Sequence, residues 1–147
     1  MTEAGRQVTV VRPERGQTVR VAGDVYRFLG TGAGTDGSYV LLEAEIAPGG
    51  GPPPHMHARE EEGFFILEGE IDFTAEGATL RVGPGAYLNM PKTTPHSFRN
   101  NTDRPARMLV LCVPAGIEHF FMEADGKPPE ALAEIAARYG ITILPPD

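Results

Sequence analysis

Several features are scarce in this chain, and each scarcity excludes a class of protein. Only one of the 147 residues, Cys112, is a cysteine, so neither an internal disulfide nor a cysteine-rich zinc site can form. No apolar run is long enough to span a membrane. Lys and Arg (13) are outnumbered by Asp and Glu (20), and the formal charge of −7 leaves no basic stripe for phosphates. We therefore expect no membrane and no nucleic acid as partner.

The beginning of the chain also lacks a targeting pattern. MTEAGRQVTV has no charged segment followed by an apolar one, which a secretory signal peptide needs. Cys112 lies in the apolar run of residues 108–113, which favours a buried, inert thiol. Together these features predict a cytoplasmic protein.

Glycine (18) and proline (14) are plentiful, and they recur at short intervals between apolar segments. Many short strands joined by tight turns produce this spacing. Strand signals fall at residues 8–11, 19–21, 24–29, 39–46, 64–68, 70–74, 78–82, 86–90, 94–99 and 106–113. We expect the segments on either side of Gly69 to form a hairpin and residues 30–37 to form a flexible loop. The strand spacing predicts an antiparallel sandwich or small barrel.

Residues 39–46 have the clearest strand pattern. Their apolar side chains alternate with polar ones, so Val40, Leu42, Ala44 and Ile46 should share one buried face.

The last third of the chain has a helical character. Residues 129–139 predict an amphipathic helix with an early proline, and Gly140 ends it. Residues 117–122 predict a short helical turn. We expect one domain over residues 1–147, with a barrel core at about 38–113 and a helical extension at about 117–140.

The stretch GGGPPPHMHAREEEGFFILEG carries most of the functional signal. Side chains alternate across a strand, so His55 and His57 point to the same face. Glu62 is out of phase with them on one continuous strand, so a turn at residues 58–60 must return it to the same point. His96, in PKTTPHSFRN, begins another strand. Three imidazoles and one carboxylate on short strands make a site for one divalent transition metal.

This ligand set restricts the chemistry without selecting the ion. Mixed nitrogen and oxygen ligation suits Fe, Mn, Ni, Co, Cu or Zn. An octahedral ion would keep two positions open for water, dioxygen or a bidentate substrate. Glu62 could also take a proton from an enol or hydroxyl substrate.

The surroundings of the ion are expected to be apolar. The residues in phase with the ligands or with the buried face are Leu42, Phe64, Ile66 and Phe98, and two weaker substrate-binding residues are Tyr87 and Met90. Core packing is the alternative explanation for all six. An apolar cavity with few polar groups suits an aromatic or enolic ligand.

Other side chains near these segments have simpler interpretations. Glu60 and Glu61 follow a turn, where acids usually form a solvated face. His119 fits no ligand spacing and is expected at the surface or at a helix end. Phe120 and Phe121 are expected to pack in the core.

The proposed ligands also lie in a pattern that resembles the two signatures of the cupin superfamily. The first, G-x5-H-x-H-x3-4-E-x6-G, is met by Gly49, His55, His57, Glu62 and Gly69. The second, G-x5-P-x-G-x2-H-x3-N, is met by Gly85, Pro91, His96 and Asn100. Thr93 replaces its middle glycine. Since a β-branched residue disfavours positive φ, we expect a turn of a different type there.

The whole chain looks like the small quercetin-dioxygenase-like cupins, on the segments PPPHMHAREEEGFFILEGEI, PAGIEHFF and YGITILPP. The resemblance implies an all-β antiparallel jelly-roll barrel (a double-stranded β-helix) with a short C-terminal helix, usually a homodimer. It implies His55, His57, Glu62 and His96 as metal ligands, with Glu62 as the catalytic base. The implied activity is a metal-dependent dioxygenase of a flavonol-like small molecule. Two alternatives stay open: an isomerase or lyase of a sugar or keto acid, and a non-catalytic binder.

Overall fold

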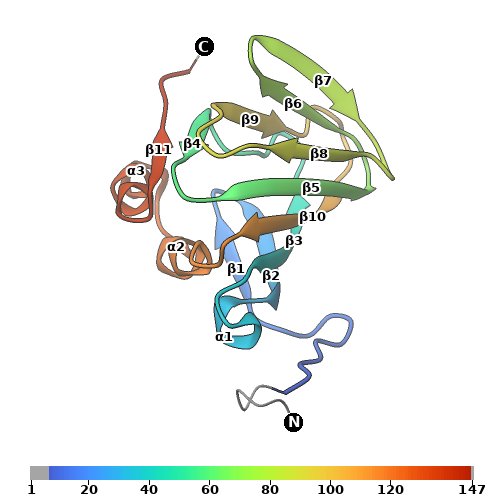
Figure 1. The fold of residues 1–147 in the computed structure, drawn as a ribbon. Helices are drawn as coiled ribbons and strands as arrows, with labels where there is room; N and C mark the ends of the chain where they lie inside the picture. Colours follow the sequence, from blue (N-terminus) through green and yellow to red (C-terminus); the bar gives the residue numbers. More distant parts are fainter. Residues whose placement is uncertain (1–6, 147) are drawn as a thin grey trace.

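Two antiparallel sheets face each other in the computed structural model, which describes residues 7–146 (Figure 1). The six-stranded sheet has the order β1-β2-β3-β10-β5-β8. Its strands are β1 (Thr18–Val21), β2 (Asp24–Gly30), β3 (Val40–Ile46), β10 (Ala106–Val113), β5 (Glu61–Glu68) and β8 (Tyr87–Met90). The five-stranded sheet has the order β11-β4-β9-β6-β7. Its strands are β11 (Ile141–Ile143), β4 (His55–His57), β9 (His96–Arg99), β6 (Ile71–Ala75) and β7 (Ala78–Val82).

The core fills the space between the sheets. The prediction for β3 is confirmed, because Val40, Leu42, Ala44 and Ile46 are all fully buried. On β5, Phe64 and Ile66 point the same way, since side chains alternate across each strand. Facing them from the other sheet are Phe73 of β6 and Phe98 of β9, whose rings lie 5.0 and 5.7 Å from that of Phe64.

The predicted hairpin about Gly69 is wrong. β5 pairs with β8 and β10, whereas β6 pairs with β7 and β9, so the chain passes from one sheet to the other at this point. Two alternating segments around a glycine look alike in a hairpin and in such a crossover. Gly69 has φ 78°, and a Cβ there would lie 2.9 Å from Cα of Ala106. Close approach of two backbones therefore requires glycine here.

The N-terminal segments differ in part from the prediction. Residues 8–11 form no strand, while residues 19–21 belong to β1. The expected loop at residues 30–37 contains a short helix, α1 (Gly32–Thr35). β1 and β2 extend the sheet beside β3, outside the range expected for the barrel core. The targeting-signal expectation rests partly on residues 1–6, which lie outside the described residues.

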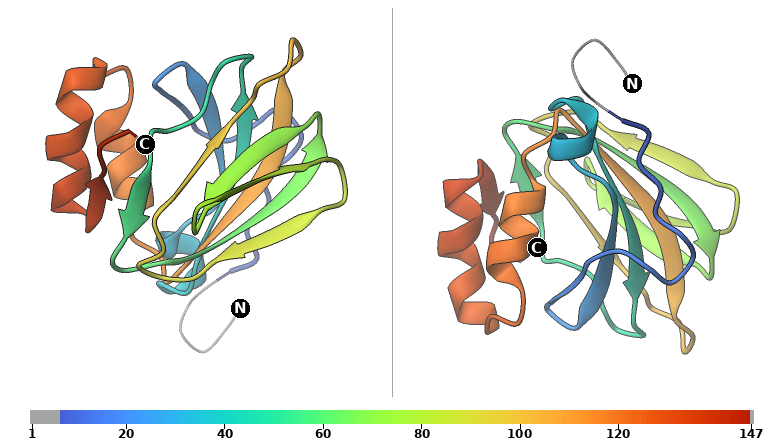
Figure 2. Two further views of the ribbon diagram at one scale, coloured as in Figure 1. Left: turned by 90° about the horizontal axis from the view of Figure 1, so that it is seen from above. Right: turned by 90° about the horizontal axis from the view of Figure 1, so that it is seen from below.

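Two helices follow the last strand of the larger sheet, as predicted. They are α2 (Glu118–Ala124) and α3 (Pro129–Arg138), and Figure 2 shows them together on one side of the sandwich. Strand β11 after them was not predicted from the sequence. It pairs with β4, with Ile141 opposite His57 and Ile143 opposite His55. Within residues 7–146, no helix combines the length and the apolar composition that crossing a membrane requires.

Candidate metal centre

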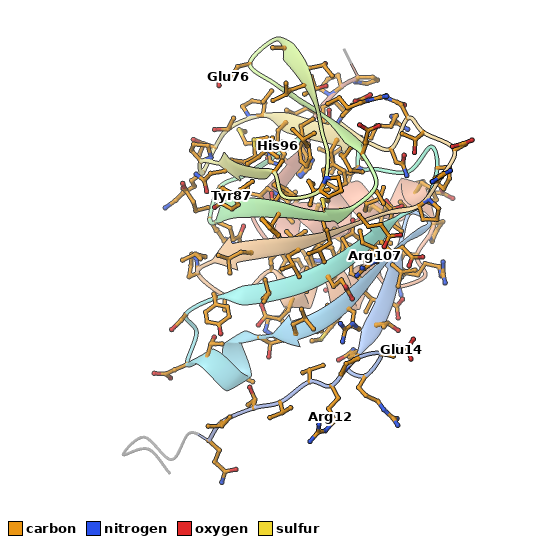
Figure 3. The ribbon with its side chains drawn as sticks, turned by 90° about the vertical axis from the view of Figure 1, so that its right-hand side faces the viewer. Arg12, Glu14, Glu76, Tyr87, His96 and Arg107 are labelled. Atoms are coloured by element: carbon orange, nitrogen blue, oxygen red, sulfur yellow. The ribbon has the colours of Figure 1, made fainter. Side chains whose placement is uncertain are left out.

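The four predicted ligands meet between the sheets. His55 and His57 come from β4, and His96 from the neighbouring β9, where it pairs directly with His55. Residues 58–60 turn the chain into the opposite sheet, so Glu62 of β5 faces the three imidazoles. All four side chains are buried, and their ligand atoms lie within 4.8 Å of one another. The turn expected between His57 and Glu62 is confirmed. Figure 3 labels His96 among the side chains of this region.

One oxygen of Glu62 lies close to two of the imidazoles in this set of four side chains, called here the ligand cluster. Oε1 of Glu62 lies 3.3 Å from Nε2 of His57 and 3.1 Å from Nε2 of His96. The centroid of the His55 ring lies 4.9 Å from that of His57 and 4.4 Å from that of His96. Such a compact set of three nitrogens and one carboxylate matches the ligands that divalent transition metals prefer.

Backbone carbonyls orient two of the imidazoles. Nδ1 of His55 lies 3.0 Å from the carbonyl oxygen of Pro53, and Nδ1 of His96 lies 2.9 Å from that of Thr94. A carbonyl only accepts hydrogen bonds, so each Nδ1 carries a proton, and with a metal bound each Nε2 would offer its lone pair to the ion. This is the tautomer that a histidine ligating through Nε2 needs.

The third imidazole faces a second glutamate instead. Nδ1 of His57 lies 3.4 Å from Oε1 of Glu60. The prediction of a solvated Glu60 is wrong, because its side chain is only 3 % exposed; the turn between the two sheets directs it inward. Glu61 keeps a partly exposed position, where it accepts hydrogen bonds from Asn89 and from the backbone of Lys92.

Both ring nitrogens of His57 are buried without a well-aligned hydrogen bond to any of residues 7–146, and so is Oε1 of Glu60. Buried polar atoms are rarely left unpaired in folded proteins. A cation bound to Nε2 of His57 would satisfy that nitrogen. It would also make the Nδ1–H group of His57 a stronger donor toward Glu60. The residues present therefore fit a divalent metal.

The electrostatics of the metal-free cluster point the same way. Burial disfavours the charge on His57, but the carboxylates of Glu60 and Glu62 outweigh it and raise its pKa to about 9. Burial, with the neighbouring His96, lowers the pKa of His55 to about 4. Burial opposes ionisation of Glu62 as well, yet the adjacent imidazoles of His57 and His96 hold its pKa below the ordinary value. The site thus stabilises one positive charge at its centre.

Cys112 touches the cluster from β10. It is buried as predicted, and its Sγ lies 3.8 Å from Oε2 of Glu62, the strand partner of Cys112. Burial, with the negative charge of Glu62, raises the pKa of the thiol well above its usual value, so the sulfur keeps its proton. The S–H donates weakly to Oε2, which leaves Oε1 directed at the imidazoles.

The loop before His96 differs from the expectation for Thr93. This residue has φ 67°, the left-handed conformation that a glycine would adopt. Its backbone N–H donates to the carbonyl of His57 at 2.8 Å, and its hydroxyl donates to the carbonyl of Lys92. These bonds offset a backbone strain of about 1–2 kcal/mol. The loop therefore keeps the glycine-type turn and ties the His96 segment to β4.

A cavity of about 210 Å³ opens beside the cluster, and its wall is almost entirely apolar. Two of the predicted substrate-binding residues, Phe64 and Phe98, line it together with His55, His57 and Glu62. Leu42, Ile66 and Met90 are buried but are not part of the lining, so they pack in the core. Tyr87 is 60 % exposed on the outer face of β8, because Leu88 and Met90 point inward on that strand (Figure 3).

Most of the cavity wall comes from segments that no sequence pattern associated with the ligands. These are Val21, Ala22, Asp24, Tyr26, Ile117, Phe120, Phe121, Pro129, Leu132, Ala133, Ile141 and Ile143. Phe120 and Phe121, expected only to pack, reach the cavity from α2. His119 on the same helix is exposed, as predicted. The apolar spacing within α2 and α3 was visible in the sequence. The surface that these apolar faces would cover could not be predicted from it.

A family model described as a cupin domain matches residues 42–114, the part of the chain that contains all four residues of the ligand cluster. The chain belongs to the cupin superfamily. The quercetin 2,3-dioxygenase of Bacillus subtilis (strain 168) is 27 % identical over 112 residues, which cover 76 % of this chain and 33 % of the relative. The chain spans about a third of the length of the curated relatives that it matches.

Solved cupin structures share the fold. The polyketide cyclase RemF from Streptomyces resistomycificus aligns with a TM-score of 0.65 and 26 % identity, covering 73 % of this chain and 80 % of that chain. A predicted oxalate decarboxylase from Thermotoga maritima aligns with a TM-score of 0.68 and 19 % identity, covering 72 % of this chain and 99 % of that chain. The two facing sheets are thus the jelly roll, or double-stranded β-helix, of this superfamily.

The contact between Glu60 and His57 leads to a prediction for metal affinity. We expect Glu60→Gln to weaken metal binding about 10- to 100-fold at pH 9, where about half of the His57 side chains are neutral, because partners of ligating histidines contribute that much. Competition with a chromophoric chelator measures the affinity. Glu61→Gln is the matched control, since Glu61 faces Asn89 and Lys92. Equal affinities for both variants and the wild type would contradict the assigned role of Glu60.

Proposed function

We propose that this cupin is a metal-dependent dioxygenase of an aromatic or enolic small molecule, with His55, His57, Glu62 and His96 as the metal ligands. The observation that carries the proposal is the buried ligand cluster at the wall of an apolar cavity. When bound, a transition metal would supply Lewis-acid polarisation and, if redox-active, electrons for dioxygen chemistry. Fe, Mn, Ni, Co and Cu, as well as the redox-inert Zn, suit the ligand set.

The side chains around the cluster have separate roles in this proposal. Glu62 takes the proton of an enol or phenol hydroxyl, because its carboxylate lies in the cavity wall beside the imidazoles. Phe64 and Phe98 provide flat apolar surfaces for a planar ring. The apolar wall excludes water, which strengthens each polar contact inside the cavity.

The similar proteins differ in how strongly they support an oxygenase. The name of the Bacillus subtilis relative, quercetin 2,3-dioxygenase, supports oxygenation of an aromatic enol. The polyketide cyclase RemF supports a cyclic organic ligand, although its name refers to another reaction. An isomerase or lyase of a sugar or keto acid would need several polar groups for hydroxyls and carboxylates. Among the cavity-lining residues only Asp24 and Tyr26 are polar apart from the ligands, which favours the oxygenase.

Oxygen consumption tests the proposal. Protein loaded in turn with Fe, Mn, Ni, Co and Cu is supplied with flavonol, maltol and catechol, and uptake is followed with an oxygen electrode. We expect uptake with at least one metal and one substrate, and none above background with metal-free protein. Tight binding of these compounds by calorimetry without any uptake would instead favour the non-catalytic binder.

A homodimer and a cytoplasmic location belong to the same proposal. The outer face of the six-stranded sheet exposes Phe65, Tyr87, Leu111 and Val113, which would need cover. Sedimentation equilibrium measures the subunit number, and a monomer at all concentrations would overturn the dimer. The cytoplasmic location stays a prediction from the sequence.

A further inference from the structure

Tyr26 of β2 is a polar residue of the cavity wall that lies outside the ligand cluster. Its side chain is only 7 % exposed, and its hydroxyl makes no hydrogen bond with any of residues 7–146. Because Tyr26 lines the cavity, its hydroxyl is available to a group that enters the cavity.

The other polar groups of the wall are already engaged. Asp24 is 2 % exposed, and its two oxygens accept the backbone N–H groups of Ala47 and Gly51 at 3.2 and 3.1 Å. The Nδ1 of His55 is held by a backbone carbonyl. Apart from the ligand cluster itself, the Tyr26 hydroxyl is therefore the uncommitted polar group that the described lining offers to a ligand.

The position and the protonation of Tyr26 are both fixed. Its backbone pairs with Val19 of β1 and with Ala44 of β3, and its ring centroid lies 4.7 Å from that of Phe121. Burial, with the negative charges of Asp24 and Glu62, raises the pKa of Tyr26, so the hydroxyl keeps its proton. The cavity thus presents one rigid hydrogen-bond donor opposite apolar walls.

We propose that the Tyr26 hydroxyl donates a hydrogen bond to an oxygen of the ligand and thereby selects small planar enolones, in which a hydroxyl and a carbonyl lie on neighbouring carbons. One oxygen of such a molecule faces the ligand cluster, and the other accepts from Tyr26. The cavity volume of about 210 Å³ lies below the usual range of about 300–1,000 Å³ for drug-sized ligands. A one-ring enolone therefore fits better than a three-ring flavonol. This inference rests on the proposed function, because it specifies the ligand of the same site.

Maltol, a one-ring enolone, is the probe for the test. Zinc-loaded protein is used, because zinc is redox-inert and permits binding to be measured without turnover. We expect Tyr26→Phe to bind maltol about tenfold more weakly than the wild type in a calorimetric titration, since a hydrogen bond to a charged or polarised oxygen is lost. Phenylalanine keeps the ring and its packing on Phe121. The zinc content of the variant should therefore equal that of the wild type.

Tyr39→Phe is the matched control, because Tyr39 is 39 % exposed and lies outside the cavity wall. It should bind maltol like the wild type. Equal maltol affinity of Tyr26→Phe and wild type, or no binding of maltol to the wild type, would overturn the inference.

The oxygen-electrode experiment separates this failure from a failure of the proposed function. Oxygen uptake by the wild type together with unchanged maltol affinity in Tyr26→Phe would overturn the role of Tyr26 and leave the oxygenase intact. Loss of maltol affinity in Tyr26→Phe without uptake for any metal and substrate would support the role of Tyr26 and reject the oxygenase.

Discussion

Replacing His57 with alanine is expected to lower metal affinity by more than about 100-fold and to leave the dialysed protein nearly metal-free. His57 is one of the four proposed ligands, and groups that only orient a ligating histidine already contribute about 10- to 100-fold. Its Nε2 is buried, makes no well-aligned hydrogen bond with any of residues 7–146 and lies 3.3 Å from Oε1 of Glu62. Elemental analysis after dialysis against a weak chelator measures the bound metal.

His119→Ala is the matched control for this variant. His119 is exposed on α2 and does not belong to the ligand cluster, so its replacement should leave the metal content unchanged. Circular dichroism checks that both variants keep the β-sheet fold. Stoichiometric metal in folded His57→Ala protein would mean that the ligand set is different.

The ligand cluster was predictable because the placement of its side chains depends on local strand geometry. The two-residue period of a strand aligns His55 with His57, and the turn at residues 58–60 brings Glu62 into phase. The same period explains why the buried face of β3 was predicted correctly. These features need only the neighbouring residues in the chain.

The cavity could not be predicted in the same way, because contacts between distant segments form it. Tyr26 and Phe121 are far apart in sequence, yet their rings are packed together in the wall. β11 has only three residues and becomes a strand by pairing with β4. Glu60 looked like a solvated acid because its neighbours are acidic, whereas the direction of a turn residue depends on the two sheets that the turn connects.

Thr93 shows that propensity can be overridden by hydrogen bonds. A β-branched residue disfavours positive φ, which predicted a different turn. In the left-handed conformation its N–H donates to the carbonyl of His57, and this bond helps to offset the unfavourable local preference. Departures from a local preference are common at functional sites.

Metal affinity is expected to rise about tenfold for each pH unit between about pH 6.5 and pH 9, a total of roughly 300-fold. In the metal-free protein the pKa of His57 is raised to about 9 from an ordinary 6.5. Below pH 9 this imidazole is therefore mostly protonated on both nitrogens, and a metal ion must displace the proton on Nε2 in order to bind there. Affinity thus falls as the pH falls, and metal should leave the site below about pH 5.

Calorimetry in two buffers with different ionisation enthalpies measures the released protons directly, and about one proton should be released for each ion bound at neutral pH.

Glu60→Gln provides the control, because removal of this carboxylate lowers the pKa of His57 toward its ordinary value. The affinity of the variant should level off at a lower pH than that of the wild type. The difference in metal affinity between the wild type and Glu60→Gln should therefore be largest at pH 9. It should narrow as the solution becomes more acidic. An affinity that is constant above pH 6.5 in the wild type would mean that His57 is unprotonated in the metal-free site, and the assigned influence of Glu60 and Glu62 on it would be wrong.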